Sequence, residues 1–187
     1  MSLTKTNTRM LEGNVPNSQL ENDSITINGS AVALGGSTTI ATGGTNTPAF
    51  DVRESSLQNI THNVYTNLTF GTELTDTDNA FSSNTFTVPS GQGGIYFLGL
   101  QVQAYSATGV LTACDVTLWK GNNNTALSRA YNKTNVVTHL ITNVNCVVTL
   151  QAGDVIGGAV TMTTNNSTGA QSYGGDQGTR LYGFKLA

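Results

Sequence analysis

The sequence predicts an all-β sandwich that carries an extended N-terminal arm, and three observations support this fold class. Thr (30), Asn (20), Ser (14) and Gly (21) together make up 85 of the 187 residues, whereas charged residues make up only 10%. β-branched residues are abundant and strong helix formers are scarce. No segment shows a convincing period of 3.6 residues, but many short runs alternate between apolar and polar residues. We therefore expect strands around one core, built from the 37% of residues that are hydrophobic.

Residues 1–47 are expected to form the arm, because large apolar residues are few there and the first aromatic residue is Phe50. The first 23 residues show no regular period. A ribbon of very short strands is predicted after them, at Ile25–Ile27, Ala31–Leu34 and Thr38–Ile40, with turns at Asn28-Gly29 and Gly35-Gly36. Such a ribbon buries too little surface to be stable alone, so the arm is expected to need a partner.

Residues 48–187 are predicted to form a head domain. Strand signals recur there at the spacing of a sandwich and are separated by turn clusters rich in Asn, Asp and Gly. The expected strands are Ala49–Val52, Thr61–Phe70, Thr85–Val88, Gly94–Tyr105, Leu111–Lys120, Thr125–Tyr131, Val136–Ile141, Val144–Leu150, Val155–Met162 and Arg180–Leu186. Turns are expected at 75–79, 89–94, 121–124, 165–169 and 174–178.

The segment Gly94–Tyr105 indicates a surface that meets another molecule. One of its faces is apolar throughout, whereas the other is apolar at Ile95 and Phe97 and polar at Gln101 and Gln103. A strand that is apolar on both faces at one end is buried on both sides there. In addition, the stretches 79–114 and 134–153 contain no Asp, Glu, Lys or Arg. Long charge-free surfaces favour packing against another subunit, so an oligomer is predicted.

Four motifs in order resemble the globular heads of the complement C1q family, which are related to tumour necrosis factor. They are Ala49-Phe50, Phe86-Thr-Val-Pro89 followed by Gly94-Ile-Tyr-Phe97, then Leu150-Gln-Ala-Gly-Asp-Val155, and finally Leu181-Tyr-Gly-Phe-Lys-Leu186. The resemblance spans about residues 48–187 and has no motif between about 104 and 143. It implies a jelly-roll β-sandwich and a compact homotrimer, with the closing strand near the subunit contacts.

The arm resembles a different group of proteins. The segments Asn17–Leu20, Asn22–Gly29 and Leu34–Ser37, with Thr39-Ile40, look like a stretch common in tail-fibre and other virion proteins of tailed bacteriophages, and Asn7–Met10 looks like their start. This resemblance implies that residues 1–40 attach the chain to other virion proteins of the capsid or tail.

No residue is predicted to be catalytic, to bind a cofactor or to hold a metal. Cys114 and Cys146 alternate with apolar neighbours, so both are expected to be small buried thiols. They are expected to stay reduced, because the start of the chain lacks a secretory signal and synthesis in the host cytoplasm follows. His62 and His139 share no metal-ligand spacing and are expected to be partly buried or surface-polar side chains.

Asp76 and Asp78 are candidate calcium ligands, but too few charged oxygens lie nearby in the sequence, so a solvated turn is favoured. Asp154 is expected to cap backbone amides of its own turn. Trp119, on the face opposite Cys114, is interpreted as a subunit contact, with a ligand-facing aromatic residue as the alternative. The exposed Tyr105, Tyr131 and Tyr173 are candidates for contact with a glycan.

These observations predict a non-enzymatic virion structural protein of a tailed phage, a homotrimer with the arm as anchor and the head on the particle surface. The chain is too neutral for a nucleic-acid binder and lacks the roughly 20 apolar residues of a membrane helix. The head is expected either to be a short tail fibre or tip that binds a host-surface glycan or protein, or to decorate the capsid as a cement protein. A free lectin-like module is the alternative. A glycan-cleaving enzyme is disfavoured by the scattered carboxylates.

Overall fold

The computed structural model describes residues 16–17, 20–27, 29–39, 46–121, 125–175 and 178–186, except for the side chains of residues 135 and 136. The chain divides into two compact units, Met1–Gly44 and Thr45–Ala187, and each is described by itself. No α-helix occurs among the described residues.

The first unit contains one antiparallel hairpin, formed by β1 (Ser24–Ile27) and β2 (Ser30–Ala33). Gly29 occupies the turn with a φ of +80°, a conformation that glycine adopts without strain. The hairpin predicted at Asn28-Gly29 is therefore confirmed. The third short strand is wrong for residues 38 and 39, which are not in a strand, and residue 40 lies outside the described residues. Residues 1–15, where most of the extended arm was predicted, also lie outside them.

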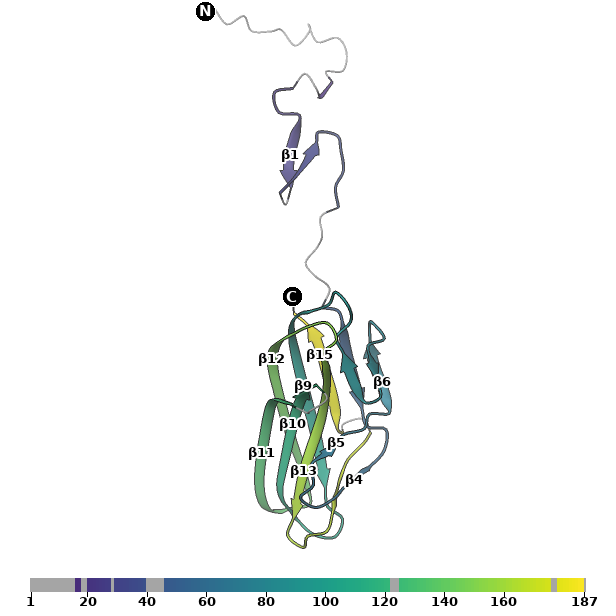
Figure 1. Ribbon diagram of the computed structural model, residues 1–187, viewed down its shortest axis with the longest axis vertical. Coiled ribbons are helices and arrows are strands. Elements are labelled where there is room, and N and C mark those ends of the chain that lie inside the picture. Colours follow the sequence, from purple (N-terminus) through teal and green to yellow (C-terminus); the bar gives the residue numbers. More distant parts are fainter. Residues whose placement is uncertain are drawn as a thin grey trace, which may run out of the picture. The chain divides into compact units, whose positions relative to one another are not determined.

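The second unit, the head, is a sandwich of two sheets (Figure 1). Its strands are β3 (Ala49–Arg53), β4 (Gln58–Ile60), β5 (Thr66–Asn67), β6 (Thr72–Asp76), β7 (Phe81–Ser82), β8 (Thr85–Thr87), β9 (Gly94–Tyr105), β10 (Leu111–Lys120), β11 (Thr125–Val137), β12 (His139–Leu150), β13 (Val155–Thr164), β14 (Ala170–Ser172) and β15 (Arg180–Lys185). One sheet has the order β11-β10-β13-β8-β7, with β5 also on β13. The other has the order β4-β14-β9-β15-β3-β6, with β12 also on β9.

The long strands pass between the sheets, as in a jelly roll: β9 and β12 belong to the seven-stranded sheet, and the β10–β11 hairpin between them belongs to the six-stranded sheet. The seven-stranded sheet has two ends. We call the end where β3 begins and β15 finishes the proximal end, and the end where β9 finishes the distal end.

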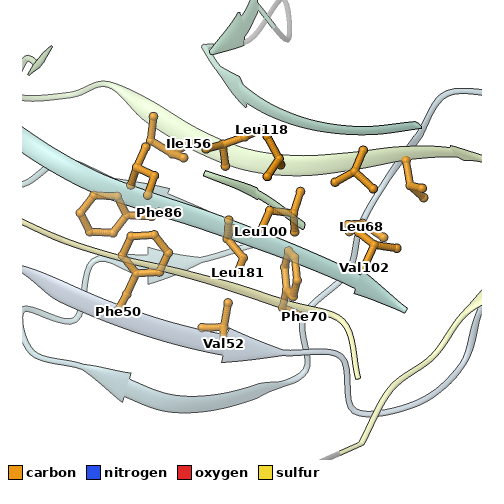
Figure 2. Close-up of a cluster of buried hydrophobic side chains, with 14 of the residues drawn as sticks. Phe50, Val52, Leu68, Phe70, Phe86, Leu100, Val102, Leu118, Ile156 and Leu181 are labelled. Atoms are coloured by element: carbon orange, nitrogen blue, oxygen red, sulfur yellow. The ribbon is translucent and has the colours of Figure 1, made fainter. Parts of the chain in front are cut away.

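The core lies between the two sheets and is filled by alternating side chains from both. Figure 2 shows Leu118 and Ile156 on one side of this space and Phe50 and Val52 on the other. The rings of Phe50 and Phe86 stack with their centroids 4.3 Å apart. Stacked aromatic pairs add about 0.5–1.5 kcal/mol beyond their burial, so this pair helps hold the sheets together.

The predicted strand Thr61–Phe70 is wrong, because this segment crosses from one sheet to the other. The Leu68 amide donates to the Gly158 carbonyl in β13 of the six-stranded sheet, and the Gly71 amide donates to the Arg53 carbonyl in β3 of the seven-stranded sheet. Only Thr66 and Asn67 pair in a ladder. Leu68 and Phe70 are buried as the alternation indicated, but they reach the core from a crossing segment.

The three strands predicted between Thr125 and Leu150 are two long strands, β11 and β12. Asn132, Lys133 and Asn143, which suggested breaks, lie within the ladders, and an irregularity in the β10–β11 ladder falls at residues 134–136. The strands β4, β6, β7 and β14, which have two to five residues each, were not predicted. β6 ends at Asp76, so the turn predicted at 75–79 begins later.

Candidate subunit interface on the head

The outer face of the seven-stranded sheet, which points away from the core, joins the two charge-free stretches. One stretch contributes β9 and the other contributes β12, and the two strands pair over twelve residues without a register shift. Tyr105 lies opposite His139 at the distal end, and Gly94 lies opposite Leu150 at the proximal end. The fold thus turns two separate sequence features into one surface.

The proximal part of this outer face is a cluster of large apolar side chains. Phe97 lies between Val147 of β12 and Phe184 of β15, and its ring is 5.6 Å from that of Phe184. Ile95 is 43% exposed and Val147 is 62% exposed. We call the following residues the apolar half of the outer face: Ile95, Phe97, Val147, Tyr182, Phe184 and Leu186. Contiguous exposed apolar residues of this kind mark interaction surfaces.

The Tyr182 ring lies flat over Gly99, which is its register partner on β9. A Cβ on Gly99 would lie 2.4 Å from Cζ of this ring, so only glycine admits the ring there. Arg180 lies 5.8 Å above the Tyr182 centroid and forms an ion pair with Asp51 of β3. This ion pair borders the apolar half on the side of β3.

The distal part of the outer face is mainly polar. It carries Gln101, Gln103 and Tyr105 on β9 and Asn143 on β12, with the exposed Ile141 as an apolar exception. Gln101 donates to the Gly178 carbonyl at 3.0 Å. The change from apolar to polar predicted along Gly94–Tyr105 therefore extends across neighbouring strands, and it divides the face into two chemically different regions.

The two cysteines are free thiols. Cys114 is fully buried, and this burial raises the pKa of its thiol to about 11. Cys146 is half-buried and packs against the core. The prediction of buried thiols is confirmed for Cys114 and holds in part for Cys146.

Both histidines serve local structure. Nδ1 of the half-buried His62 accepts a hydrogen bond from the Thr164 amide at 3.2 Å. His139 is exposed, and its ring lies 4.6 Å from that of Tyr105. Among the described residues, no three His, Cys, Asp or Glu side chains gather as a metal site would require.

Asp76 and Asp154 bind backbone amides, whereas Asp78 accepts a hydrogen bond from the Thr77 hydroxyl at 2.6 Å. Asp76 accepts hydrogen bonds from the amides of Ala80 (3.0 Å) and Phe81 (2.8 Å), which occupies both of its oxygens. Asp154 accepts from the Gln151 amide at 2.7 Å and pairs with Lys120 at 2.9 Å. The predicted turn-capping role of Asp154 is thus confirmed.

Trp119 lies over the neighbouring strand β13 and is not part of the core between the two sheets. Its ring covers Gly157, where a Cβ would lie 2.2 Å from the ring atom Cζ2, and only 6% of the side chain is exposed. This leaves little surface for the subunit contact that the sequence suggested or for a ligand. Tyr131 and Tyr173 are exposed, as expected, whereas Tyr105 is only partly exposed.

Sequence reasoning missed Glu54, an acid that is only 1% exposed. Oε1 of Glu54 accepts a hydrogen bond from the Ser172 hydroxyl at 2.7 Å, whereas Oε2 has no partner among the described residues. Burial raises the pKa of Glu54 to about 7, and hydrogen bonds from Ser172 and Thr179 offset this only in part. No periodicity signals such a residue, because it directly follows a strand.

Solved structures resemble the head. The globular domain of zebrafish complement 1qA protein matches with a TM-score of 0.51 and 17% identity, covering 75% of this chain and 98% of that one. Murine APRIL at pH 5.0 matches with a TM-score of 0.57 and 15% identity, covering 74% and 98%. Eiger TNF from S. frugiperda matches with a TM-score of 0.54 and 13% identity, covering 74% and 92%.

The head is a C1q/TNF-type jelly roll. The fold class expected from the four motifs is confirmed. The sequence matches no protein-family model and no curated protein. The matched part of the chain is about three quarters of its length, which is about the part that belongs to the unit Thr45–Ala187. Among the described residues, no helix is long and apolar enough to cross a membrane.

Proposed function

We propose that this protein is a non-enzymatic, homotrimeric virion component of a tailed phage, whose heads associate through the apolar half of the outer face. The observation that carries the proposal is this apolar half, where Val147 and Ile95 stand exposed beside Phe97 on two strands that contain no charged residue. Burial of such side chains stabilises by roughly 25 cal/mol per Å². The C1q resemblance supports three copies around an axis.

The arm would attach the trimer to the particle. Ile25 of β1 is 53% exposed, and Leu34, which directly follows β2, is also exposed, so the hairpin leaves part of its apolar surface uncovered. A two-stranded ribbon of this size is marginal alone, which supports docking on another virion protein through residues 1–40. The resemblance of this segment to tail-fibre proteins supports the same assignment.

We favour the tail tip as the location, with host attachment as the role. The neutral polar side chains at the distal end, such as Gln103 and Asn143, suit recognition of a host-surface molecule. Capsid decoration is the second candidate, since an arm with uncovered apolar side chains also suits a clamp on neighbouring capsid subunits. A free lectin-like module would need no such arm.

Sedimentation equilibrium tests the assembly. The wild-type chain should sediment at three times 19.5 kDa, and Val147→Glu should sediment as a monomer because it places a charge within the apolar half. Tyr131→Glu is the matched control, since Tyr131 is 61% exposed on a strand of the other sheet and should leave the trimer intact. A monomeric wild-type chain would refute the trimer.

Imaging of intact particles tests the location. Labelled chain should appear at the tail vertex, whereas threefold density on the capsid lattice would replace the tip by the decoration role. Deletion of residues 1–23 should leave a soluble trimer that no longer joins particles. Incorporation of this truncated chain would refute the anchoring role of the arm.

A further inference from the structure

The distal end of the head contains a depression of about 390 Å³, within the range of roughly 300–1,000 Å³ typical of ligand pockets. Strands β4 and β14 and the loop after β9 form its walls. Its lining residues are Asn59, Ile60, Thr61, Ala107, Thr108, Gly169, Ala170 and Gln171. None of these residues is charged and none belongs to the apolar half, so association through that half does not use them.

The walls of the depression are held in place by specific contacts. Gln171 lies opposite Asn59 in the ladder and donates to its Oδ1 at 2.8 Å. The Thr108 carbonyl accepts from the Asn166 side chain at 2.7 Å. At Gly169 a Cβ would lie 2.7 Å from the Ile60 carbonyl oxygen, so the chain passes too close for a side chain. The depression is therefore preformed.

The hydrogen-bonding groups of the depression are amides and hydroxyls. The Gln171–Asn59 bond uses one donor and one acceptor, and each side chain keeps further donor and acceptor capacity. Thr61 and Thr108 add hydroxyls that can both donate and accept, and the Thr108 hydroxyl already shares one hydrogen bond with the Thr168 hydroxyl at 3.2 Å. Such groups match ligands that carry several hydroxyls, each of which is itself a donor and an acceptor.

An aromatic side chain adjoins these groups. Tyr105 is the register partner of Gln171 on β9, and cross-strand partners lie about 5 Å apart at Cβ. Tyr105 in turn lies 4.6 Å from the His139 ring. Asn59, Gln171, Tyr105 and His139 thus form one row across four strands on the outer face.

We propose that this depression binds a neutral saccharide of one or two sugar units, with Asn59, Gln171 and Thr108 bonding its hydroxyls and Tyr105 packing against its C–H face. The proposal rests on the host-attachment role proposed above and names its ligand class. A phosphate, sulfate or carboxylate would need a cationic partner, and no Lys or Arg lines the depression.

The test uses the full chain on printed arrays of oligosaccharides. One array carries neutral bacterial surface oligosaccharides, and the other carries sulfated and uronic-acid-containing ones. Binding to neutral oligosaccharides is expected, and the best one is then titrated by calorimetry. The double variant Asn59→Ala/Gln171→Ala should bind it at least tenfold more weakly. Gln151→Ala, at an exposed glutamine in the turn 151–154 of the proximal end, should bind like the wild type.

Circular dichroism of the double variant confirms that it folds, and Thr108→Val provides a second, milder change of the same site. Unchanged affinity in the double variant overturns the site, and binding to the acidic array alone overturns the neutral class. Absence of saccharide binding by a chain located at the tail tip overturns this inference but not the proposed function. If the chain is absent from phage particles, the proposed function is overturned. Saccharide binding that is lost when Gln171 is replaced would still support the saccharide site.

Discussion

The buried acid Glu54 makes the stability of the head depend on pH in a defined direction. Its pKa is about 7 in the folded chain, against 4.5 for an exposed glutamate, because burial disfavours the charged form. The folded state therefore binds the proton more tightly than the unfolded state. The contribution of Glu54 to the free energy of unfolding is therefore most favourable below pH 4.5, decreases as the pH rises towards 7, and then stays low.

The substitution Glu54→Gln removes this dependence. A difference of about 2.5 pKa units corresponds to roughly 3 kcal/mol. The free energy of unfolding of the variant minus that of the wild type should therefore increase by about this amount from pH 4.5 to pH 8. Gln keeps the shape of the side chain and an oxygen that can accept from the Ser172 hydroxyl.

Urea unfolding at pH 4.5 and pH 8, at one fixed protein concentration, measures this gain. The matched control is Glu73→Gln, at an exposed glutamate of β6, which keeps Glu54 and should therefore lose as much free energy of unfolding between the two pH values as the wild type does. The reasoning is refuted if Glu54→Gln and the wild type lose the same free energy of unfolding between pH 4.5 and pH 8.

Gly99→Ala should lower the free energy of unfolding by about 1–3 kcal/mol in urea titrations, because the new methyl group would overlap the Tyr182 ring; an unchanged midpoint would show that the ring moves freely. Phe86→Ala should cost about 3–5 kcal/mol and lower the melting temperature, since the ring is fully buried and stacked on Phe50. Ellman's reagent at pH 8 should modify Cys114 only after unfolding, because burial raises its pKa to about 11; rapid labelling of Cys114 in the folded protein would contradict its position.

Long strands with regular alternation were predictable from the sequence. Gly94–Tyr105 and Leu111–Lys120 match β9 and β10 to the residue, because each strand has enough residues to show which face is apolar. Short strands such as β14 were not predictable, since their pairing is set by neighbours distant in the sequence. The segment 61–70 alternates like a strand, but the amides of Leu68 and of Gly71, which follows the segment, donate to two different sheets.

The candidate interface was predictable in part. Ile95 and Phe97 indicated a second buried face on one strand, and the charge-free stretches indicated where it lies. The contribution of Tyr182 and Phe184 depends on the pairing of β15 with β9, which joins residues about 85 positions apart. The buried Glu54 and the distal depression arise only when separate loops meet, so no local pattern reveals them.

The position of β12 has a consequence for the unassembled subunit. Among the described strands, β12 pairs only with β9, so its other side is an open sheet edge. Natural proteins protect such edges with lysines, prolines or bulges, and β12 has none of these over twelve residues. Isolated subunits are therefore prone to edge-to-edge aggregation, and covering this edge during assembly would protect the chain. Overproduced subunits that cannot assemble should precipitate in a concentration-dependent way.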